Sequence, residues 1–351
     1  DAATPATGLT GWMTDVQHVF SGTCSSSALT YVPDNAFEMY LETHDASGNV
    51  VAMGDPTSMG DATSASDPLN GTVFTNRIDT VLSLYIPNLS ISDLTGIEDF
   101  TALLGLYAKN NSIPLINLIQ NINLIYLNLE GNLLSNIDVR NNVNLTYLDL
   151  SHNLLSKIDI TNNVNLDEID LAYNSFSVID FSQNSIIKNV YLSNNQLTGT
   201  FSLSNKPKIN GVFVSNNQIS KIKIVNSTSA TGALYILFGN NLVEDFDFTG
   251  SKVGGISASN NLLTSLDLSQ QKVYMLFVSN NKLTNLNLNN GYNSYLTMGF
   301  GIRNNPDLKC VEVSDLTIAN ARWGNKDAQT SYSTDCSSVW MVNIPNANLL
   351  A

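Results

Sequence analysis

Apolar residues return along the middle of the chain at a fixed phase, with a period of about 21 residues. Relative to a recurring asparagine, they stand eight, five and three places before it and two places after it, as Leu145, Leu148, Leu150 and Leu155 do around Asn153. The residues between the three leading positions are mostly polar or aromatic. This alternation predicts one short strand in each period, with the leucines facing a core.

The asparagine itself marks ten periods, which are separated by 21, 21, 21, 21, 22, 24, 20, 20 and 24 residues. Its side-chain amide can turn inward and pair with backbone groups of adjoining turns that water cannot reach. We therefore predict a structural ladder that consists of Asn111, Asn132, Asn153, Asn174, Asn195, Asn217, Asn241, Asn261, Asn281 and Asn305.

The combined pattern, L-x-x-L-x-L-x-x-N-x-L, resembles the signature of leucine-rich repeats. After the asparagine, segments such as 155–162 (LSKIDITN) and 263–269 (LTSLDLS) alternate apolar and polar residues, which predicts a second short strand on the convex side. A turn of about 21 residues leaves no room for an α-helix. We expect a mostly β horseshoe or arc of ten to eleven turns of 20–24 residues, with short parallel strands and little helix outside the N-terminal cap.

The repeat also predicts which side chains face outward on the concave side, namely those six, four and two places before each asparagine. The first column is Gly105, Tyr126, Tyr147, Glu168, Asn189, Gly211, Tyr235, Gly255, Met275 and Gly299. The second is Tyr107, Asn128, Asp149, Asp170, Tyr191, Phe213, Leu237, Ser257, Phe277 and Gly301. The third is Lys109, Glu130, Ser151, Ala172, Ser193, Ser215, Gly239, Ser259, Ser279 and Arg303.

Two candidate binding patches follow from these columns. An acidic pocket with aromatic walls combines Glu130, Asp149, Glu168 and Asp170 with Tyr126, Tyr147 and Tyr191. An apolar strip further along consists of Phe213, Tyr235, Leu237, Met275 and Phe277. The alternative is that these aromatic residues serve only as cross-strand pairs that stabilise the sheet.

Composition excludes several classes of function. The 351 residues include only 16 Lys and Arg, and the formal net charge is −14, which argues against nucleic acid or an anionic membrane as partner. No run of about 18 apolar residues exists, so we expect no membrane insertion. His18, His44 and His152 show no metal-ligand spacing. Asp149 and Asp170 imitate a glycosidase pair, but they sit on an open ribbon, and we expect no enzyme.

The two ends of the chain share a second, longer period. Trp12, Cys24 and Pro33 recur in the same order as Trp323, Cys336 and Pro345, and the cysteines and the prolines are each 312 residues apart. We interpret the chain as one module of a tandem array. Its expected parts are the tail of a preceding module (1–30), an N-terminal cap (31–80), the repeats (81–305), a C-terminal cap (306–336) and the start of a following module (337–351).

This interpretation also accounts for three cysteines, an odd number. We predict a disulfide between Cys310 and Cys336 that closes the C-terminal cap, and a partner for Cys24 in the preceding module. A loop of about 25 residues closed in this way is worth about 3 kcal/mol in the loop-entropy account. The alternative for Cys24 is a buried free thiol.

The caps resemble those of secreted leucine-rich repeat proteins of Bacteroidetes, especially flavobacteria. The resemblance rests on 31–40 (YVPDNAFEMY), 91–103 (ISDLTGIEDFTAL), 304–313 (NNPDLKCVEV) and the run from Trp323 to Cys336. It implies export by the type IX secretion system and a place in a large, adhesin-like surface chain. The sorting domain expected at the end of such a protein is absent, which fits an internal module or a processed fragment.

The N-terminal cap departs from this family by its greater length. Pro33 is expected to begin a short helix with Phe37 and Leu41 on one face, before a loop over 43–72 that is rich in Asp, Gly, Ser and Asn. Oxygen ligands for calcium are available from Asp45, Asn49, Asp55 and Asp61, although the regular spacing of a calcium-binding hand loop is missing. The alternative is a solvated loop without a metal, and no other cofactor is expected.

Taken together, the sequence predicts a non-enzymatic, extracellular or cell-surface module for adhesion or for self-assembly into a surface polymer. One alternative is recognition of a glycan or protein ligand on the concave face, and another is a purely architectural spacer. The expected partners are other copies or neighbouring modules of the same protein, surface glycans, or host or prey proteins.

Overall fold

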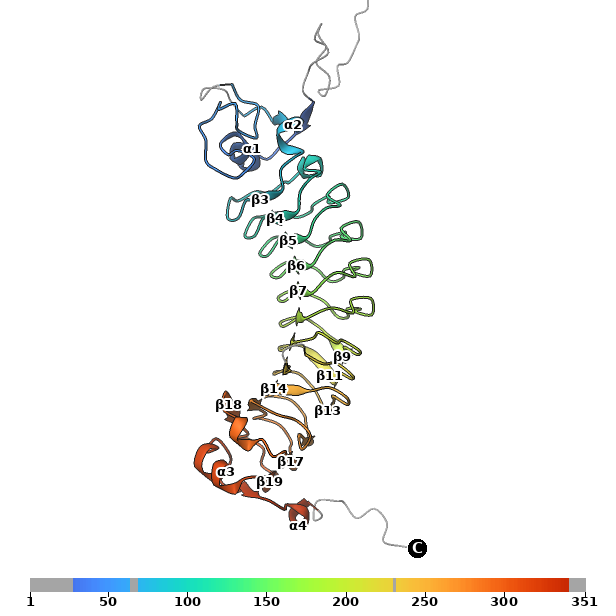
Figure 1. Ribbon diagram of the computed structural model, residues 1–351, viewed down its shortest axis with the longest axis vertical. Helices are drawn as coiled ribbons and strands as arrows, with labels where there is room; N and C mark the ends of the chain where they lie inside the picture. Colours follow the sequence, from blue (N-terminus) through green and yellow to red (C-terminus); the bar gives the residue numbers. More distant parts are fainter. Residues whose placement is uncertain (1–27, 64–68, 230–231, 341–351) are drawn as a thin grey trace, which may run out of the picture.

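The chain folds into a parallel β-solenoid of about 12 turns with little helix. The structure is a computed structural model, and it describes residues 28–63, 69–229 and 232–340. Figure 1 shows the turns stacked along the long axis, with the N-terminal cap at the top and the C-terminal cap at the bottom. The predicted fold class is therefore confirmed. Trp12, Cys24, Pro345 and the expected start of a following module beyond residue 340 lie outside the described residues, so the tandem interpretation stays a prediction.

The main sheet has eleven strands, all parallel, which follow one another turn by turn along the solenoid. It runs through β3 (Ser83–Tyr85), β4 (Gly105–Tyr107), β5 (Tyr126–Asn128), β6 (Tyr147–Asp149), β7 (Glu168–Asp170), β8 (Asn189–Tyr191), β10 (Gly211–Phe213), β12 (Leu234–Leu237), β14 (Val253–Ser257), β16 (Met275–Phe277) and β18 (Gly299–Gly301). These strands form the concave face.

The second strand of the repeat forms only in the C-terminal half. There the convex side carries a three-stranded sheet and a four-stranded sheet. The first contains β9 (Thr198–Ser202), β11 (Gln218–Lys223) and β13 (Asp245–Asp247), and the second contains β15 (Ser265–Asp267), β17 (Asn285–Leu288), β19 (Cys310–Val313) and β20 (Ser331–Ser333).

The predicted convex strand over 155–162 is wrong, since no strand forms there. A surface hollow of about 320 Å³ is lined by residues of 136–140 and 157–159, which are convex segments of two neighbouring turns. The carboxylate of Asp159 instead accepts hydrogen bonds from the N–H and hydroxyl of Thr161 within its own turn.

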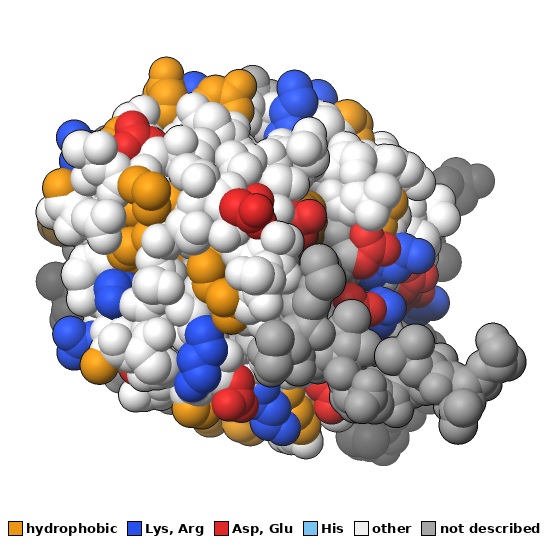
Figure 2. Space-filling model, turned by 90° about the horizontal axis from the view of Figure 1, so that it is seen from below, with side chains coloured by type: hydrophobic (Ala, Val, Ile, Leu, Met, Phe, Trp, Pro, Cys, Tyr) orange, Lys and Arg blue, Asp and Glu red, His pale blue; other side chains and the backbone are white. Residues whose placement is uncertain are grey.

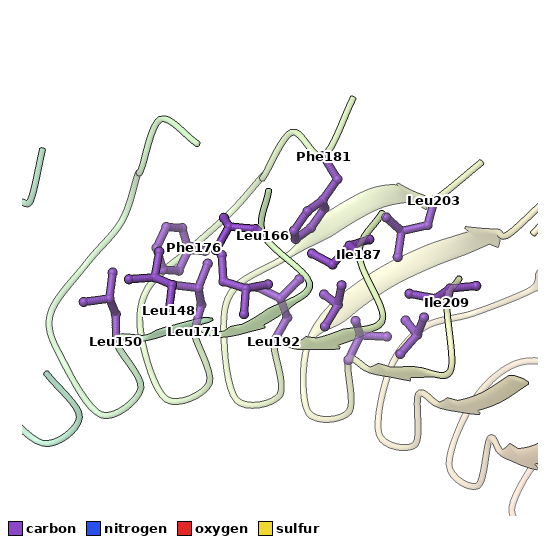
Figure 3. Close-up of a cluster of buried hydrophobic side chains, with 14 of the residues drawn as sticks. Leu148, Leu150, Leu166, Leu171, Phe176, Phe181, Ile187, Leu192, Leu203 and Ile209 are labelled. Carbon is purple, nitrogen blue, oxygen red and sulfur yellow. The ribbon is translucent and has the colours of Figure 1, made fainter. Parts of the chain in front are cut away.

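The leucines of the repeat form one continuous core along the solenoid. Leu145, Leu148, Leu150 and Leu155 are all fully buried. Figure 3 shows how side chains such as Leu148, Leu171 and Leu192 from successive turns fill the space between the two faces. Each such side chain contributes about 1.5–3 kcal/mol when it is removed from water.

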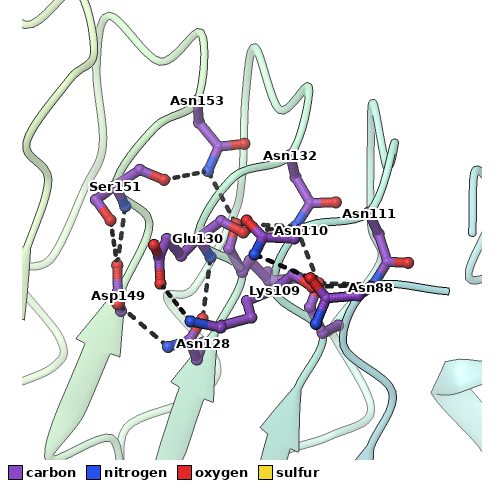
Figure 4. Close-up of polar contacts among 12 residues, drawn as sticks. Asn88, Lys109, Asn110, Asn111, Asn128, Glu130, Asn132, Asp149, Ser151 and Asn153 are labelled. Atoms are coloured by element: carbon purple, nitrogen blue, oxygen red, sulfur yellow. Dashed lines mark hydrogen bonds and ion pairs between the residues drawn. The ribbon is translucent and has the colours of Figure 1, made fainter. Parts of the chain in front are cut away.

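The asparagine ladder makes the hydrogen bonds that the repeat predicts. The Asn153 side-chain amide donates to the carbonyls of Leu129 and Leu150, at 2.9 and 3.0 Å, and its Oδ1 accepts from the N–H of Leu134 at 3.0 Å. Figure 4 shows Asn111, Asn132 and Asn153 in the same place in successive turns. Asn174 and Asn195 make the same bonds although they are only partly buried.

A second polar ladder, which the sequence did not reveal to us, runs along the opposite side of the core. Its members are all buried and occur once per turn: Asn121, Asn142, Asn163, Asn184, Lys206, Ser227, Ser251, Gln271 and Asn293. The Lys206 ammonium donates to the carbonyl of Phe181 at 2.7 Å, and burial lowers the pKa of Lys206. Because the residue type changes along the ladder, no single letter repeats in the sequence.

The N-terminal cap contains β1 (Leu29–Tyr31), β2 (Thr72–Phe74), α1 (Asn35–Glu42) and α2 (Thr75–Ile78). As predicted, a helix follows Pro33 and buries Phe37 and Leu41. Asp34 caps this helix by accepting from the N–H groups of Ala36 and Phe37, and its other oxygen accepts from Ser92. Asp34 therefore joins the cap to the first repeats.

The C-terminal cap contains α3 (Leu316–Arg322) and β20, and α4 (Ser337–Trp340) follows it. The short 3-10 helices η1 (Ile97–Asp99) and η2 (Asn293–Tyr295) lie earlier in the chain. The predicted disulfide between Cys310 and Cys336 is present. Trp323 is buried and stacks on Phe300 of β18. Figure 2 shows that mostly uncharged polar surface covers this end of the molecule, with apolar side chains only scattered across it. Such a surface suits a cap that ends the stack.

Candidate functional site

The strand register places the outward side chains of the concave face in the predicted columns. Tyr126 pairs with Tyr147, and Tyr147 pairs with Glu168. In the second column Asp149 pairs with Asp170. The same register continues to β18 and adds Ser83 and Tyr85 of β3 at the other end. Sequence reasoning missed that turn because Leu89 stands where the ladder asparagine would be.

The predicted acidic pocket has Asp149 at its centre. This side chain is only 6% exposed, and its oxygens accept hydrogen bonds from Asn128 Nδ2 at 3.1 Å and from the N–H and Oγ of Ser151 at 3.0 and 2.8 Å. Asp170 accepts from the N–H of Ala172 at 2.9 Å. Figure 4 shows the Asp149 end of this network together with Glu130 and Lys109.

The two outer carboxylates of the pocket have partners of their own. Glu130 forms an ion pair with Lys109 at 3.4 Å, and Glu168 accepts from Asn189 Nδ2 at 3.0 Å. Only one of the four carboxylates of the pocket is therefore paired with a cation among the described residues. The structure brings these four predicted residues together on three neighbouring strands and their ends.

Burial, together with neighbouring negative charges, raises the pKa values of the two inner carboxylates of the pocket. Burial raises the pKa of Asp170 to about 6, and the charges of Asp149, Glu130 and Glu168 add to that increase. Burial also raises the pKa of Asp149, although hydrogen bonds from Ser151 oppose the shift. A proton or the cationic group of a partner would relieve this repulsion.

The tyrosines beside the pocket stack on one another along the solenoid. The ring centroids of Tyr126 and Tyr147 are 4.2 Å apart with an angle of 1° between the planes, and those of Tyr107 and Tyr126 are 4.5 Å apart. Tyr85 extends the row at 5.8 Å from Tyr107. The faces of the inner rings are therefore covered by their neighbours, and the row presents ring edges and hydroxyls to the outside.

Glycines on the concave face make room for the aromatic rings of the apolar strip. A Cβ atom at Gly255 would stand 2.3 Å from Tyr235 Cδ1, and one at Gly299 would stand 2.4 Å from Phe277 Cζ. Gly211 makes room for Phe213 in the same way, and Phe213 stacks on Tyr191 at 4.6 Å. The sequence signal was a glycine in a column next to an aromatic residue.

A rim of the concave face carries a feature that sequence reasoning missed. The residue just before each ladder position adopts a left-handed conformation, and in most turns it is Asn, as with Asn110 and Asn194. In two adjacent turns it is His152 and Tyr173, both with φ of 55°. A bulky residue in this region is unusual.

These two side chains stand on the rim beyond Ser151 and Ala172, next to the acidic pocket. Their rings stack with centroids 4.1 Å apart, and Tyr173 is 51% exposed. The pocket thus lies between two sets of aromatic side chains, Tyr126 and Tyr147 in the first column and His152 and Tyr173 on the rim. The sequence signal was the replacement of Asn in the recurring Asn-Asn pair.

The calcium candidates of the N-terminal loop do not converge. Asp45 accepts hydrogen bonds from Ser47 and Asn49, and Asp55 accepts from the N–H and hydroxyl of Thr57. Asp61 accepts from the hydroxyl of Thr72. Within the described parts of the chain, no group of three or more His, Cys, Asp or Glu side chains is placed to hold a metal ion.

Two further features would indicate other classes of protein, namely a cluster of histidines and a membrane-spanning helix. Of the two histidines in the described ranges, His44 stacks on Tyr40 in the N-terminal cap and His152 stands on the rim, so these two do not share a site; His18 lies outside the described residues. None of the helices that the structure describes has the length and apolar character needed to cross a membrane.

Comparison with known proteins identifies the fold. No protein-family model and no curated protein matches the sequence. Among solved structures, the leucine-rich repeat domain of APL1B is 18% identical with a TM-score of 0.52, over 72% of this chain and 75% of that one. The LRIM1/APL1C complex gives 17% identity and a TM-score of 0.51, over 74% of this chain and 50% of that one.

A bacterial structure also resembles this chain more distantly. It is a leucine-rich repeat protein from Bacteroides eggerthii, with 14% identity and a TM-score of 0.42, over 76% of this chain and 59% of that one. The repeat pattern, the strand register and the similarity to the APL1B and LRIM1/APL1C structures define the fold as a leucine-rich repeat solenoid.

Proposed function

We propose that this chain is a non-enzymatic, extracellular partner-binding module that acts in adhesion or in self-assembly into a surface polymer. The observation that carries the proposal is the concave face, on which a row of carboxylates and a strip of aromatic and aliphatic side chains stand at fixed spacing on a rigid sheet. Contiguous apolar side chains at a surface commonly mark a place where another molecule binds.

The apolar strip is the part of this surface that suits a protein partner. Tyr235 and Leu237 of β12 and Met275 and Phe277 of β16 occupy the same two columns, with Gly255 and Ser257 of β14 between them. The four apolar side chains are only partly buried. One of the similar solved structures is a complex, that of LRIM1 with APL1C, and this supports a protein as partner.

Two observations support the proposed location outside the cell, namely the disulfide bond and the resemblance of the caps to those of secreted proteins. A disulfide joins Cys310 and Cys336, and such bonds persist in oxidising compartments. The resemblance to secreted flavobacterial surface proteins adds type IX export as part of the same proposal. The open concave ribbon, without walls that exclude water, supports a role other than catalysis.

The experiment that tests this proposal is sedimentation velocity of the purified chain from about 1 to 200 μM. If the module assembles through its concave face, the wild type forms larger species as the concentration rises. The double variant Leu237→Gln and Met275→Gln should raise the apparent dissociation constant of self-association at least tenfold, because it removes apolar area from the strip.

A matched control is available on the convex side. Leu115 and Val178 are 68% and 75% exposed there, and the double variant Leu115→Gln and Val178→Gln should associate as the wild type does. Equal weakening by both pairs would remove the concave face from the proposal. A monomer at every concentration would exclude self-assembly. If the protein adheres to cells or surfaces and the concave double variant adheres equally well, the architectural spacer is favoured.

Glycan recognition is a second candidate, for which the apolar strip is a more suitable site than the tyrosine row. Tyr107 and Tyr147 cover the two faces of Tyr126, and Tyr126 covers one face of Tyr147, so this row leaves little ring surface for a sugar to stack on. Tyr235 and Phe277 lie across glycines of the next strand, and no other described ring stacks on them. A glycan array with the wild type and with Phe277→Leu would test this candidate, which requires saturable binding that the variant loses.

A further inference from the structure

The four asparagines at the start of the second polar ladder have one feature in common. Asn121, Asn142, Asn163 and Asn184 are fully buried, and the Oδ1 atom of each has no hydrogen-bond partner in the protein. Buried polar atoms in native proteins nearly always have a partner, either in the protein or in ordered water. Four such oxygens in four consecutive turns therefore point to a bound ligand that lies between the turns.

The orientation of these amides is fixed by their nitrogen atoms. Asn142 Nδ2 donates to the carbonyls of Leu118 and Asn121 at 3.1 and 2.8 Å, and Asn163 Nδ2 donates to those of Val139 and Asn142 at 2.9 and 2.8 Å. A reversed amide would place Oδ1 against two carbonyl oxygens and lose both bonds. The unpartnered atoms are therefore the oxygens.

Later members of the ladder show what a satisfied oxygen looks like. Gln271 Oε1 accepts from the N–H of Val253 at 2.9 Å, and Ser251 Oγ accepts from the N–H of Ser227 at 2.9 Å. In the first four turns the corresponding N–H groups are already engaged, as the N–H of Asn142 is with the carbonyl of Val139 at 3.0 Å. The side-chain oxygens of Ser251 and Gln271 thus accept from backbone N–H groups, whereas those of the first four asparagines do not.

We propose that a file of water molecules binds inside the solenoid, with one water between each pair of successive asparagines from Asn121 to Asn184. The Asn142 and Asn163 amides donate directly to carbonyls of the preceding turn, so successive turns lie close together at this ladder. Equivalent oxygens one β spacing apart, about 5 Å, are too far from each other for direct contact. Two O–H···O bonds of about 2.8 Å span up to about 5.6 Å, so one water can donate to both oxygens. Four oxygens leave three such intervals.

Water fits this column better than a metal ion does. Calcium takes six to eight oxygen ligands, usually with carboxylates among them, whereas each interval offers two unengaged amide oxygens. A surface hollow of about 330 Å³ is lined by Leu118, Asn141 and Asn162 among others, and the last two are the neighbours in sequence of Asn142 and Asn163. Leu118 is also the residue whose carbonyl holds the Asn142 amide.

A crystal structure of the wild-type chain at about 1.5 Å resolution tests the proposal directly. The expected result is solvent density 2.6–3.2 Å from the Oδ1 atoms of both asparagines in each of the three intervals. Absence of density there, or a backbone N–H that reaches the oxygen instead, would overturn it. A coordination shell of six oxygens with shorter distances would replace water by a cation and would also overturn it.

Magnetic relaxation dispersion of water oxygen-17 gives an independent count in solution. The double variant Asn142→Leu and Asn163→Leu touches all three intervals and should lose about three long-lived waters relative to the wild type. Gln271→Leu is the matched control and should lose none, because Gln271 Oε1 is paired with a backbone N–H. Equal losses in both variants would contradict the proposal, and the wild-type crystal structure decides the matter if the double variant does not fold.

Discussion

At the scale of single residues, the turns differ from one another mainly in their buried amide and carboxylate side chains. The leucines are nearly interchangeable between turns, whereas each polar side chain inside the solenoid needs partners in the turns next to it. Asn153, for example, bonds to Leu129 and Leu134 of the preceding turn and to Leu150 of its own. A buried group of this kind left without partners costs about 1–3 kcal/mol.

The substitution Asp170→Asn should stabilise the protein near neutral pH. The folded-state pKa of Asp170 is about 6, above the ordinary 3.8. The favourable contribution of its proton is therefore complete below about pH 4 and is lost as the pH rises through 6. Asparagine keeps the acceptor for the Ala172 N–H and removes the charge. Thermal unfolding at pH 7.5 should show a gain of about 2 kcal/mol, after allowance for solvent screening, and the gain should vanish at pH 4.

Asp159→Asn provides the matched control for that measurement. Hydrogen bonds from the side chain and backbone of Thr161 lower the pKa of Asp159, so its carboxylate favours the folded state above the ordinary pKa. The control should therefore lower the melting temperature at pH 7.5 slightly. A lower melting temperature for Asp170→Asn at the same pH would contradict the view that charge is crowded in the pocket.

The residue scale also shows what the sequence can and cannot predict. The main asparagine ladder is predictable because one letter recurs at one phase. The second ladder is not, since Asn184 is followed by Lys206 and Ser227, which share only burial and a hydrogen-bonding function. The packing of Tyr235 on Gly255 and of Phe277 on Gly299 depends on the conformations of the aromatic side chains. The sequence pattern does not specify these conformations.

At the scale of elements, the concave strands follow from the sequence, and the convex strands follow only in part. The alternation in 263–269 produces β15, but the same alternation in 155–162 produces no strand. A parallel strand needs a neighbour at about 4.8 Å, and the distance between neighbouring turns on the convex side depends on the curvature of the whole stack. A single repeat does not encode that distance.

The C-terminal cap should depend on its disulfide. The bond joins residues 26 apart, and its removal in Cys310→Ser with Cys336→Ser should cost about 3 kcal/mol. Amide hydrogen exchange should rise first in β19, α3 and β20, which the bond holds against the last repeats. The measurement is exchange monitored by mass spectrometry under native conditions.

Cys24→Ser is the control for this experiment, because it changes a cysteine and leaves the bond between Cys310 and Cys336 in place. Its exchange pattern in the cap should equal that of the wild type. Unchanged protection of the cap in the double serine variant would show that the packing of Trp323 on Phe300 suffices without the bond.

At the scale of the whole molecule, the long period of 312 residues predicts a larger native assembly. Intact mass and electron microscopy of the native material, without proteolysis, measure this. A mass several times 38.1 kDa, or a filament with a regular repeat, is the expected result. A single chain of 38.1 kDa would contradict the tandem interpretation and leave the thiol of Cys24 to be explained.

The convex sheets, which are confined to the C-terminal half, give the solenoid two halves of different mechanical character. In the N-terminal half, a sheet joins successive turns on the concave side alone, and single backbone bonds such as that from the Leu154 N–H to the Leu134 carbonyl add to it. In the C-terminal half, sheets join the turns on both sides. A load along the axis is then carried by fewer bonds per turn in the first half. If the chain serves as a link in a surface polymer, its N-terminal turns yield first under tension and act as the compliant spring, and its C-terminal turns act as the stiff rod.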